Sequence, residues 1–314
     1  MDSSKLPLLA VVGLTASGKS GFSLHLTAAL GERGIACEII SADAFQLYRG
    51  MDIGTAKIPV DERRGIPHHL LDVLPLEEKA SVADYQRSSR QIIEQIRARK
   101  ALPILVGGSG LYVRAALDKI EFPGTDSAIR AQLEAQAAQL GIEKMHQRLA
   151  EVDPQSAARI VSTNERRVIR ALEVYELTGK KFSATMPRRE YFQPALQLGI
   201  SWPLPVLDER ITQRTTQMLA QGFIAEVEEL QKLGLADTPT ACRATGYQAV
   251  MDLLAGEITR DEAAEQIALQ TRQLARKQRK WFRKDSRIHW LDGEEGTSAN
   301  LEQALTLLEI NEEQ

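Results

Sequence analysis

Short apolar segments alternate with longer helical patterns in the first third of the chain. Residues 6–12 (LPLLAVV) and 102–106 (LPILV) are continuous apolar runs, and residues 38–40 (EII) form a shorter, mainly apolar one. Helical patterns at residues 19–30 and 82–100 separate these runs. Continuous apolar strands that alternate with helices are typical of a parallel sheet covered by helices on both faces. The pattern therefore predicts an α/β fold.

The pattern changes near residue 123. Residues 127–175 contain no strand-like run and are rich in Ala, Gln, Glu and Leu, and Asp153-Pro154 has the sequence of a helix start. Strand character returns at residues 195–201. We therefore predict that residues 123–195 are a helical insertion.

Two long helical patterns, at residues 211–233 and 260–284, follow the insertion. We expect the apolar run at residues 288–291 to be a last strand at the edge of the sheet. Residues 1–122 and 196–314 then form one α/β core, because strand and helix patterns alternate on both sides of the insertion.

Composition is that of an ordinary globular protein. The 314 residues are 43% hydrophobic and 26% charged, with a formal net charge of −3. A nucleic-acid partner therefore needs a local basic patch. Cys37 and Cys242 are too far apart in sequence to form a metal-ligand cluster. Because we find no signal-peptide pattern and no membrane-length apolar segment, we expect a cytoplasmic protein without a membrane partner.

The first apolar run ends in a glycine-rich segment that precedes a helix. The segment consists of Gly13, Leu14, Thr15, Ala16, Ser17, Gly18, Lys19 and Ser20. Glycines let backbone N–H groups turn toward phosphate oxygens, and the helix N-terminus adds a positive dipole end. Lys19 adds a mobile charge, and the Ser20 hydroxyl is placed to bind Mg²⁺. The segment therefore predicts a site for a diphosphate or triphosphate.

An acidic residue, Asp43, follows the second apolar run. The carboxyl ends of strands line the ligand crevice of an open α/β sheet, so we expect Asp43 near the phosphate loop. There it has the chemistry of a general base, or of a Mg²⁺ ligand acting through water. A helix cap or a solvated loop acid is the alternative.

Gly107 and Gly108 end the third apolar run and permit a ligand or another backbone to approach closely. Ser109 follows them, at a position where a hydroxyl bonds phosphate or caps a helix. A plain strand-to-helix turn is an equally good interpretation.

Arg210 and Arg214 have helical i, i+4 spacing. Two guanidinium groups on one helix face suit a bidentate clamp on a diphosphate. Surface pairing with Glu226 or Asp208 is the alternative.

Cationic residues gather in two places. One group consists of Arg272, Arg276, Lys277, Arg279, Lys280, Arg283, Lys284 and Arg287, with Trp281 and Phe282 among them. The other lies in the insertion, at Arg166, Arg167 and Arg170. Such groups suit a phosphate backbone, and a solvated helix face is the alternative.

Taken in order, these motifs resemble those of the bacterial tRNA dimethylallyltransferase family, isopentenyl transferases that modify an adenosine beside the anticodon. Residues 13–20 resemble the family's GPTASGKT loop, and residues 41–57 (SADAFQLYRGMDIGTAK) resemble its SADSxQxYRGMDIGTAKP stretch. Further matches are IPHHL at 66–70, LPILVGGSGLY at 102–112, RRVIRALE at 166–173 and RQLARKQ at 272–278. The resemblance thus covers nearly the whole chain.

The departures from the family pattern are modest. Leu14 replaces a Pro, whereas Ser20 and Ser109 each replace a Thr and keep its hydroxyl. Ala44 replaces a Ser, so that position lacks a hydroxyl for RNA.

The resemblance implies a P-loop NTPase-like parallel sheet with an all-helical insertion. It also implies that adenine N6 attacks the first carbon of dimethylallyl diphosphate, and that the acceptor is the adenosine 3′ of the anticodon in tRNAs reading codons that begin with U. Asp43, Lys19 and Thr15 are then catalytic, Mg²⁺ is the cofactor at Ser20, and Arg210 or Arg214 holds the diphosphate.

The resemblance further implies that the insertion grips the anticodon stem-loop of tRNA and that the target base leaves its stack. The implied tRNA contacts are Asp43, Ala44, Phe45, Gln46, Ser109, Arg130, Asn164, Arg166, Arg167, Arg170, Arg272 and Arg276. We expect a monomer.

Two other functions share parts of this pattern. A small-molecule or nucleoside kinase has the phosphate loop, which usually implies ATP or GTP, and the acid after the second strand, but it does not explain residues 41–57 or the basic segment at 272–287. A non-catalytic RNA-binding module has no use for Lys19 together with Asp43. Prenyl transfer is the preferred hypothesis.

Overall fold

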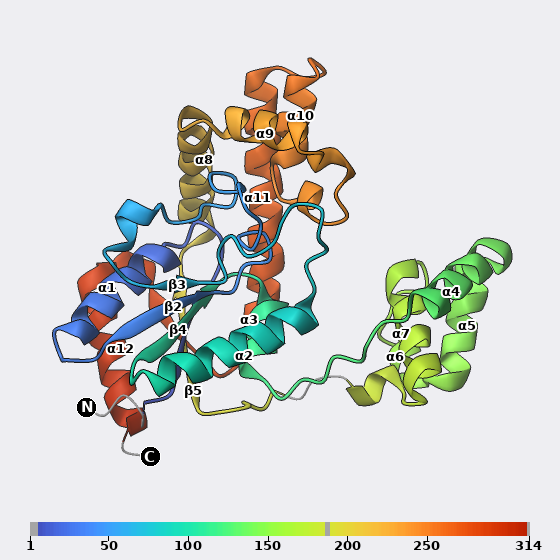
Figure 1. Ribbon diagram of the computed structural model, residues 1–314, viewed down its shortest axis with the longest axis horizontal. Helices are drawn as coiled ribbons and strands as arrows, with labels where there is room; N and C mark the ends of the chain where they lie inside the picture. Colours follow the sequence, from blue (N-terminus) through green and yellow to red (C-terminus); the bar gives the residue numbers. More distant parts are fainter. Residues whose placement is uncertain (1–5, 186–188, 313–314) are drawn as a thin grey trace. The chain divides into compact units, whose positions relative to one another are not determined.

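Six parallel strands form one sheet in the order β3-β2-β4-β1-β5-β6 (Figure 1). The structure, a computed structural model, describes residues 6–185 and 189–312. The strands are β1 Leu8–Gly13, β2 Cys37–Ser41, β3 His68–His69, β4 Leu102–Gly107, β5 Ala195–Ser201 and β6 Ile288–Asp292. Every residue of β1, β2 and β4 is buried, which explains the unbroken apolar pattern of β1 and β4. In β2 the apolar residues are interrupted by the buried Glu38, whose carboxylate bonds Arg99 and His69. The predicted parallel α/β sheet, with its edge strand at 288–292, is confirmed.

Helices cover both faces of this sheet. The helices on one face, α1 Lys19–Gly31 and α12 Gly296–Glu312, pack on each other (Figure 1). The other face carries α2 Val82–Ala98 and α3 Gly110–Leu117. The main core lies between α1, α12 and the sheet, where alternate strand residues such as Leu9, Val11, Ile39, Ile104 and Leu198 are at most 3% exposed.

Four further helices belong to the same unit: α8 Leu204–Ala220, α9 Phe223–Lys232, α10 Tyr247–Leu254 and α11 Arg260–Phe282. The prediction of one helix over residues 211–233 is wrong, because Gly222 has φ 106° and separates α8 from α9. A capping box between Thr259 and Glu262 starts α11. None of the helices in the described part of the chain is long and apolar enough to cross a membrane.

Residues 118–190 form a separate compact unit of helices. Its helices are α4 Ser127–Leu140, α5 Ile142–Val152, α6 Pro154–Ala157 and α7 Glu165–Thr178. Asp153 caps α6 through the Ser156 N–H, as the Asp-Pro pair predicted. The unit's limits differ by five residues from the predicted 123–195. The Phe192 N–H donates to the Leu117 carbonyl, so residues 191–195 belong with the sheet.

Candidate active site

The phosphate loop follows β1 and turns tightly into α1. Gly13, Ala16 and Gly18 have φ values of 137°, 60° and 88°, so the backbone passes repeatedly through the left-handed region. Side chains from elsewhere hold the loop's carbonyl groups: Arg210 Nε donates to Ala16 (2.9 Å) and Trp202 Nε1 donates to Ser17 (3.0 Å). The loop shape is thus set by its glycines and by external supports.

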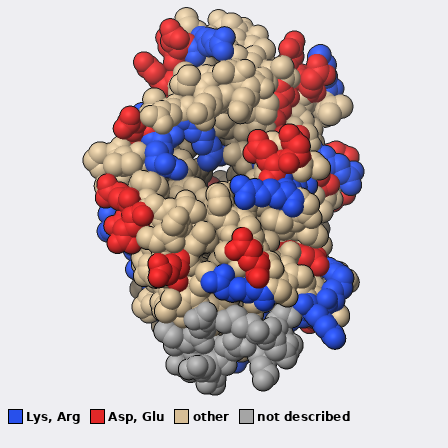
Figure 2. All heavy atoms as spheres, turned by 90° about the vertical axis from the view of Figure 1, so that its left-hand side faces the viewer, with Lys and Arg blue, Asp and Glu red and all other residues tan. Residues whose placement is uncertain are grey.

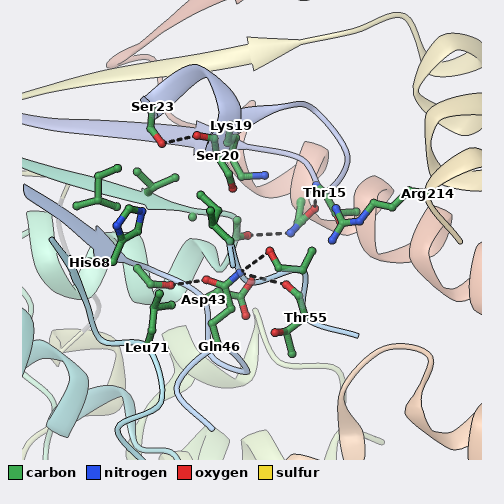
Figure 3. Close-up of a pocket in the computed structure, with 18 of the residues that line it drawn as sticks. Thr15, Lys19, Ser20, Ser23, Asp43, Gln46, Thr55, His68, Leu71 and Arg214 are labelled. Carbon is green, nitrogen blue, oxygen red and sulfur yellow. Dashed lines mark hydrogen bonds between the residues drawn. The ribbon is translucent and has the colours of Figure 1, made fainter. Parts of the chain in front are cut away.

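Lys19 begins α1 and projects into the pocket beside the loop (Figure 3). Its ammonium group donates to the Leu14 carbonyl at 2.5 Å. Burial and, to a smaller extent, the Arg214 cation lower the pKa of Lys19 to about 7, and the Asp43 carboxylate partly opposes this shift. An anion bound at Lys19 would therefore restore its charge.

Asp43 lies just beyond the end of β2, where the strand rule predicted it. Its Oδ1 accepts the Phe45 N–H at 2.9 Å, a contact within the loop and not the cap of a helix. The carboxylate nevertheless lines the same pocket as Lys19. The Ala42 N–H donates to the Val106 carbonyl at 2.8 Å and thereby ties the start of this segment to β4.

The pocket runs across the carboxyl ends of β1, β4 and β2 (Figure 3). Polar side chains of Thr15, Lys19, Ser20, Asp43 and Arg214 line it. A second pocket shares Thr15, Asp43 and Arg214 with the first and is lined further along by apolar side chains of α8 and α11, among them Ile211, Met218 and Ile267. The pocket with the phosphate-binding groups and the carboxylate thus lies next to a pocket with apolar walls.

The two arginines of α8 have different surroundings. Arg214 lines both pockets, and its guanidinium group lies 3.4 Å from the Thr15 hydroxyl. Burial lowers the pKa of Arg214, while Asp43 raises it. Arg210 instead stacks on the Trp202 ring at 4.4 Å and supports the loop backbone from outside. Only Arg214 of the two reaches the space beside Asp43.

The alternative of acidic partners for these arginines is wrong. Asp208 pairs with Arg276 through two contacts of 2.5 Å, and Glu226 accepts hydrogen bonds from the backbone of residues 52–54.

Gln278 is a pocket residue to which sequence reasoning gave no role. Its Oε1 accepts the Thr15 N–H at 2.8 Å, and its Nε2 donates to the Gly108 carbonyl at 3.0 Å. An added Cβ at Gly108 would lie 2.6 Å from this nitrogen, so the glycine is needed for the contact. Gln278 thus ties α11 to both glycine-rich loops. Its one sequence signal is its place in the RQLARKQ match.

His68 is a second pocket residue without a predicted role, although it lies in the IPHHL match. Its Nδ1 is 2.8 Å from the Ile66 carbonyl, which only accepts, so Nδ1 carries the proton. Nε2 is buried and has no partner among the residues described. Burial lowers the pKa of His68 and favours this neutral ring at the end of the pocket away from Arg214 (Figure 3).

The other predicted RNA contacts near Asp43 make hydrogen bonds within the protein or line its pockets. The Ser109 hydroxyl accepts the Ala44 N–H at 3.3 Å. The Gln46 amide bonds the Ser41 hydroxyl and the carbonyls of residues 55 and 56. Phe45 lines the second pocket.

On α11, the predicted RNA-binding arginines already have partners. Arg276 pairs with Asp208, and Arg272 donates to the Thr212 hydroxyl at 3.3 Å. The exposed cations here are Lys277 and Lys280, near the C-terminal end of α11, and Arg283 and Lys284, which follow its last residue. On the face seen in Figure 2, cationic and anionic side chains are interspersed, in keeping with the small net charge.

Within the 118–190 unit, some of the predicted RNA contacts already have partners in the protein and others are exposed. The buried Glu173 carboxylate pairs with Arg130 (2.5 Å) and Arg170 (2.9 Å). Burial alone would raise the pKa of Glu173, but the hydrogen bonds from these arginines hold it below its usual value. Asn164 caps α7 through the Arg167 N–H. Arg166 and Arg167 are exposed on the first turn of α7.

Known proteins resemble this chain in sequence and in fold. The family described as IPP transferase matches residues 46–285. The tRNA dimethylallyltransferase of Thermobifida fusca is 52% identical, over 90% of this chain and 89% of its own length. That of Kineococcus radiotolerans is 50% identical, over 99% and 98%.

Two solved structures share the fold. The tRNA isopentenylpyrophosphate transferase of Bacillus halodurans is 36% identical, with a TM-score of 0.69 and coverage of 98% of each chain. A eukaryotic dimethylallyltransferase acting on tRNA is 25% identical, with a TM-score of 0.79, over 95% of this chain and 77% of its own. The phosphate loop, Asp43 and the ordered motifs thus occur in a chain that belongs to the IPP transferase family.

Proposed function

We propose that this protein transfers the dimethylallyl group of dimethylallyl diphosphate to N6 of the adenosine 3′ of the anticodon in tRNAs that read codons beginning with U. The observation that carries the proposal is one pocket that joins Lys19, Arg214 and the phosphate loop to the Asp43 carboxylate. Relatives that share about half of this sequence and are named tRNA dimethylallyltransferases support it.

In the proposed reaction, the N6 lone pair forms a bond to the first carbon of the prenyl group. The bond from that carbon to the diphosphate oxygen breaks, and its electron pair leaves with the diphosphate. Lys19, Arg214 and the loop N–H groups stabilise the charge that develops on the leaving oxygens. Asp43 accepts the N6 proton as general base. The apolar side chains of the adjoining pocket suit a five-carbon prenyl group.

The residues at the loop fit a Mg²⁺ ion. The described residues contain no group of three or more His, Cys, Asp or Glu side chains that could hold a metal. Mg²⁺ usually keeps several waters and binds through one or two carboxylates together with substrate phosphates. The Ser20 hydroxyl would be a direct ligand, and the Asp43 carboxylate, which lines the same pocket, would reach the ion through a bound water and stay available as the base. A bound Mg²⁺ would supply positive charge to the departing diphosphate.

The tRNA is proposed to bind through exposed cations. Exposed basic groups available to phosphates include Lys277 and Lys280 of α11, Arg283 and Lys284 directly after it, and Arg166 and Arg167 of α7. Arg130, Arg170, Arg272 and Arg276 are engaged within the protein and would have to bind RNA with the nitrogen atoms those contacts leave free.

The decisive experiment offers the protein unmodified tRNA with dimethylallyl diphosphate or with ATP. Mass analysis of the digested nucleosides should detect N6-isopentenyladenosine only with the prenyl donor. Lys19→Ala should abolish it. Phosphoryl transfer from ATP without prenylated adenosine would refute the proposal.

A further inference from the structure

A carboxylate on α9 holds a backbone turn that is distant from it in sequence. Glu226 Oε2 accepts the N–H groups of Asp52 (2.9 Å) and Ile53 (2.6 Å). Its Oε1 accepts the Gly54 N–H (3.1 Å) and the Tyr247 hydroxyl (2.7 Å). An ionised carboxylate has about four acceptor positions, so every one of them is used.

The turn lies directly against the buried aromatic residues beside Glu226. The rings of Phe223 and Tyr247 meet edge to face, with centroids 5.0 Å apart, and both residues are fully buried. An added Cβ at Gly54 would lie 2.3 Å from the Phe223 ring and 2.5 Å from the Tyr247 ring. The turn therefore fits against these rings in one position, and Glu226 holds its backbone there.

This turn reaches the active-site pocket through Gln46. The Gln46 Nε2 donates to the carbonyls of Thr55 (3.1 Å) and Ala56 (3.3 Å), which directly follow the turn. Its Oε1 accepts the Ser41 hydroxyl at 2.8 Å. Gln46, Thr55 and Ala56 line the pocket with Asp43 (Figure 3). The orientation of the Gln46 amide thus depends on the position of the turn.

We propose that Glu226 is a positioning residue for prenyl transfer, acting through the 52–56 segment on the Gln46 amide beside Asp43. The inference rests on the proposed function. Because Glu226 is held by turn N–H groups and by Tyr247, it acts on the geometry of the reacting groups. It therefore affects turnover and leaves the affinity for dimethylallyl diphosphate unchanged.

Glu226→Gln is the most informative substitution. It keeps the length and helix propensity of the side chain, but its amide nitrogen donates, so two of the four donors lose their acceptor. The matched control is Glu229→Gln on the same helix, where an exposed carboxylate pairs only with Lys232. Tyr247→Phe, which keeps the three backbone contacts, should have a smaller effect.

We expect Glu226→Gln to lower kcat roughly 10- to 100-fold, the range for misplacement of about 1 Å, without raising the KM for dimethylallyl diphosphate. Hydrogen exchange of the backbone amides at residues 52–54 should become faster than in the wild type, whereas Glu229→Gln should change neither kcat nor exchange. A raised KM for tRNA with unchanged kcat would overturn the proposal.

A double-mutant cycle tests the route through Gln46. In a Gln46→Ala background, Glu226→Gln should lower kcat much less than it does alone, because the group it positions is already absent. An equal loss in both backgrounds would overturn the proposal. If Glu226→Gln does not fold, Tyr247→Phe replaces it in the same cycle. Wild-type product formation tests the proposed function separately, since the cycle depends only on ratios between variants.

Discussion

Gly107→Ala tests whether the backbone before Asp43 has to be held in place. A Cβ at residue 107 would lie 2.2 Å from the Ala42 carbonyl oxygen and 2.5 Å from its carbonyl carbon. Non-bonded carbon contacts are favourable at about 3.5–4.0 Å, so one strand end must move by roughly 1 Å. Ala42 resists this movement, because its N–H donates to Val106 (2.8 Å) and its carbonyl accepts the Ser109 N–H (3.3 Å).

Two effects follow from this overlap. Overpacking costs about 1–3 kcal/mol, and loss of one hydrogen bond adds about 1 kcal/mol, so the free energy of unfolding should fall by about 2–4 kcal/mol. Asp43 is the next residue after Ala42, and its carboxylate moves with the strand end. Because a misplacement of about 1 Å costs roughly 100-fold, kcat should fall by that factor.

The assay is the initial rate of N6-isopentenyladenosine formation with both substrates saturating, together with the thermal midpoint of unfolding. Gly31→Ala is the matched control. It ends α1, an added Cβ there meets nothing within 4 Å, and alanine should leave kcat unchanged. Wild-type kcat in a folded, destabilised Gly107→Ala protein would show that Asp43 does not need this support.

Three further predictions concern the pocket and the basic surface. Asp43→Ala should lower kcat by roughly 100-fold or more with little change in the Kd for tRNA, and near-wild-type kcat would exclude Asp43 as the base. The pKa of Lys19 is about 7 in the free protein, so above pH 7 the binding of dimethylallyl diphosphate should be coupled to protonation of Lys19. Dimethylallyl diphosphate should therefore bind more weakly as the pH rises. Calorimetry in buffers of different ionisation enthalpy measures this proton uptake, which Lys19→Met should abolish. Reversal of the four exposed charges at the C-terminal end of α11 and directly after it should weaken tRNA binding and reduce the salt dependence of that binding. An unchanged salt dependence would identify these residues as a solvated surface. The residues to reverse are Lys277, Lys280, Arg283 and Lys284.

The sheet was predictable because its central strands are buried on both faces. β1 and β4 then appear in the sequence as continuous apolar runs and β2 as a shorter one that contains the buried Glu38, and each ends at a residue of the site. β3 has only two residues, which is too short to produce a pattern. The break between α8 and α9 was missed because apolar spacing continues through Gly222, whose positive φ ends the helix.

The phosphate loop and Asp43 were predictable because local spacing and strand position determine where they lie. Gln278 and Glu226 were not, because each meets backbone N–H or carbonyl groups of a distant segment. Every non-proline residue carries such groups, so no residue type marks the partner. Arg276 shows the same limit for ion pairs: Asp208 lies 68 positions away, and only the packing of α11 on α8 selects it.

The structure also explains how a phosphate loop can serve a transfer in which the phosphates leave. Three side chains support the shape of the loop. Arg210 and Trp202 donate hydrogen bonds to its carbonyl groups, and Gln278 accepts one from the Thr15 N–H. Gln278 belongs to α11, whose exposed cations are the proposed tRNA contacts. One rigid helix therefore contacts the diphosphate loop and carries the proposed tRNA surface. Under the proposed function, the distance between the acceptor and the leaving group is set by α11, and no nucleotide hydrolysis is needed to bring them together.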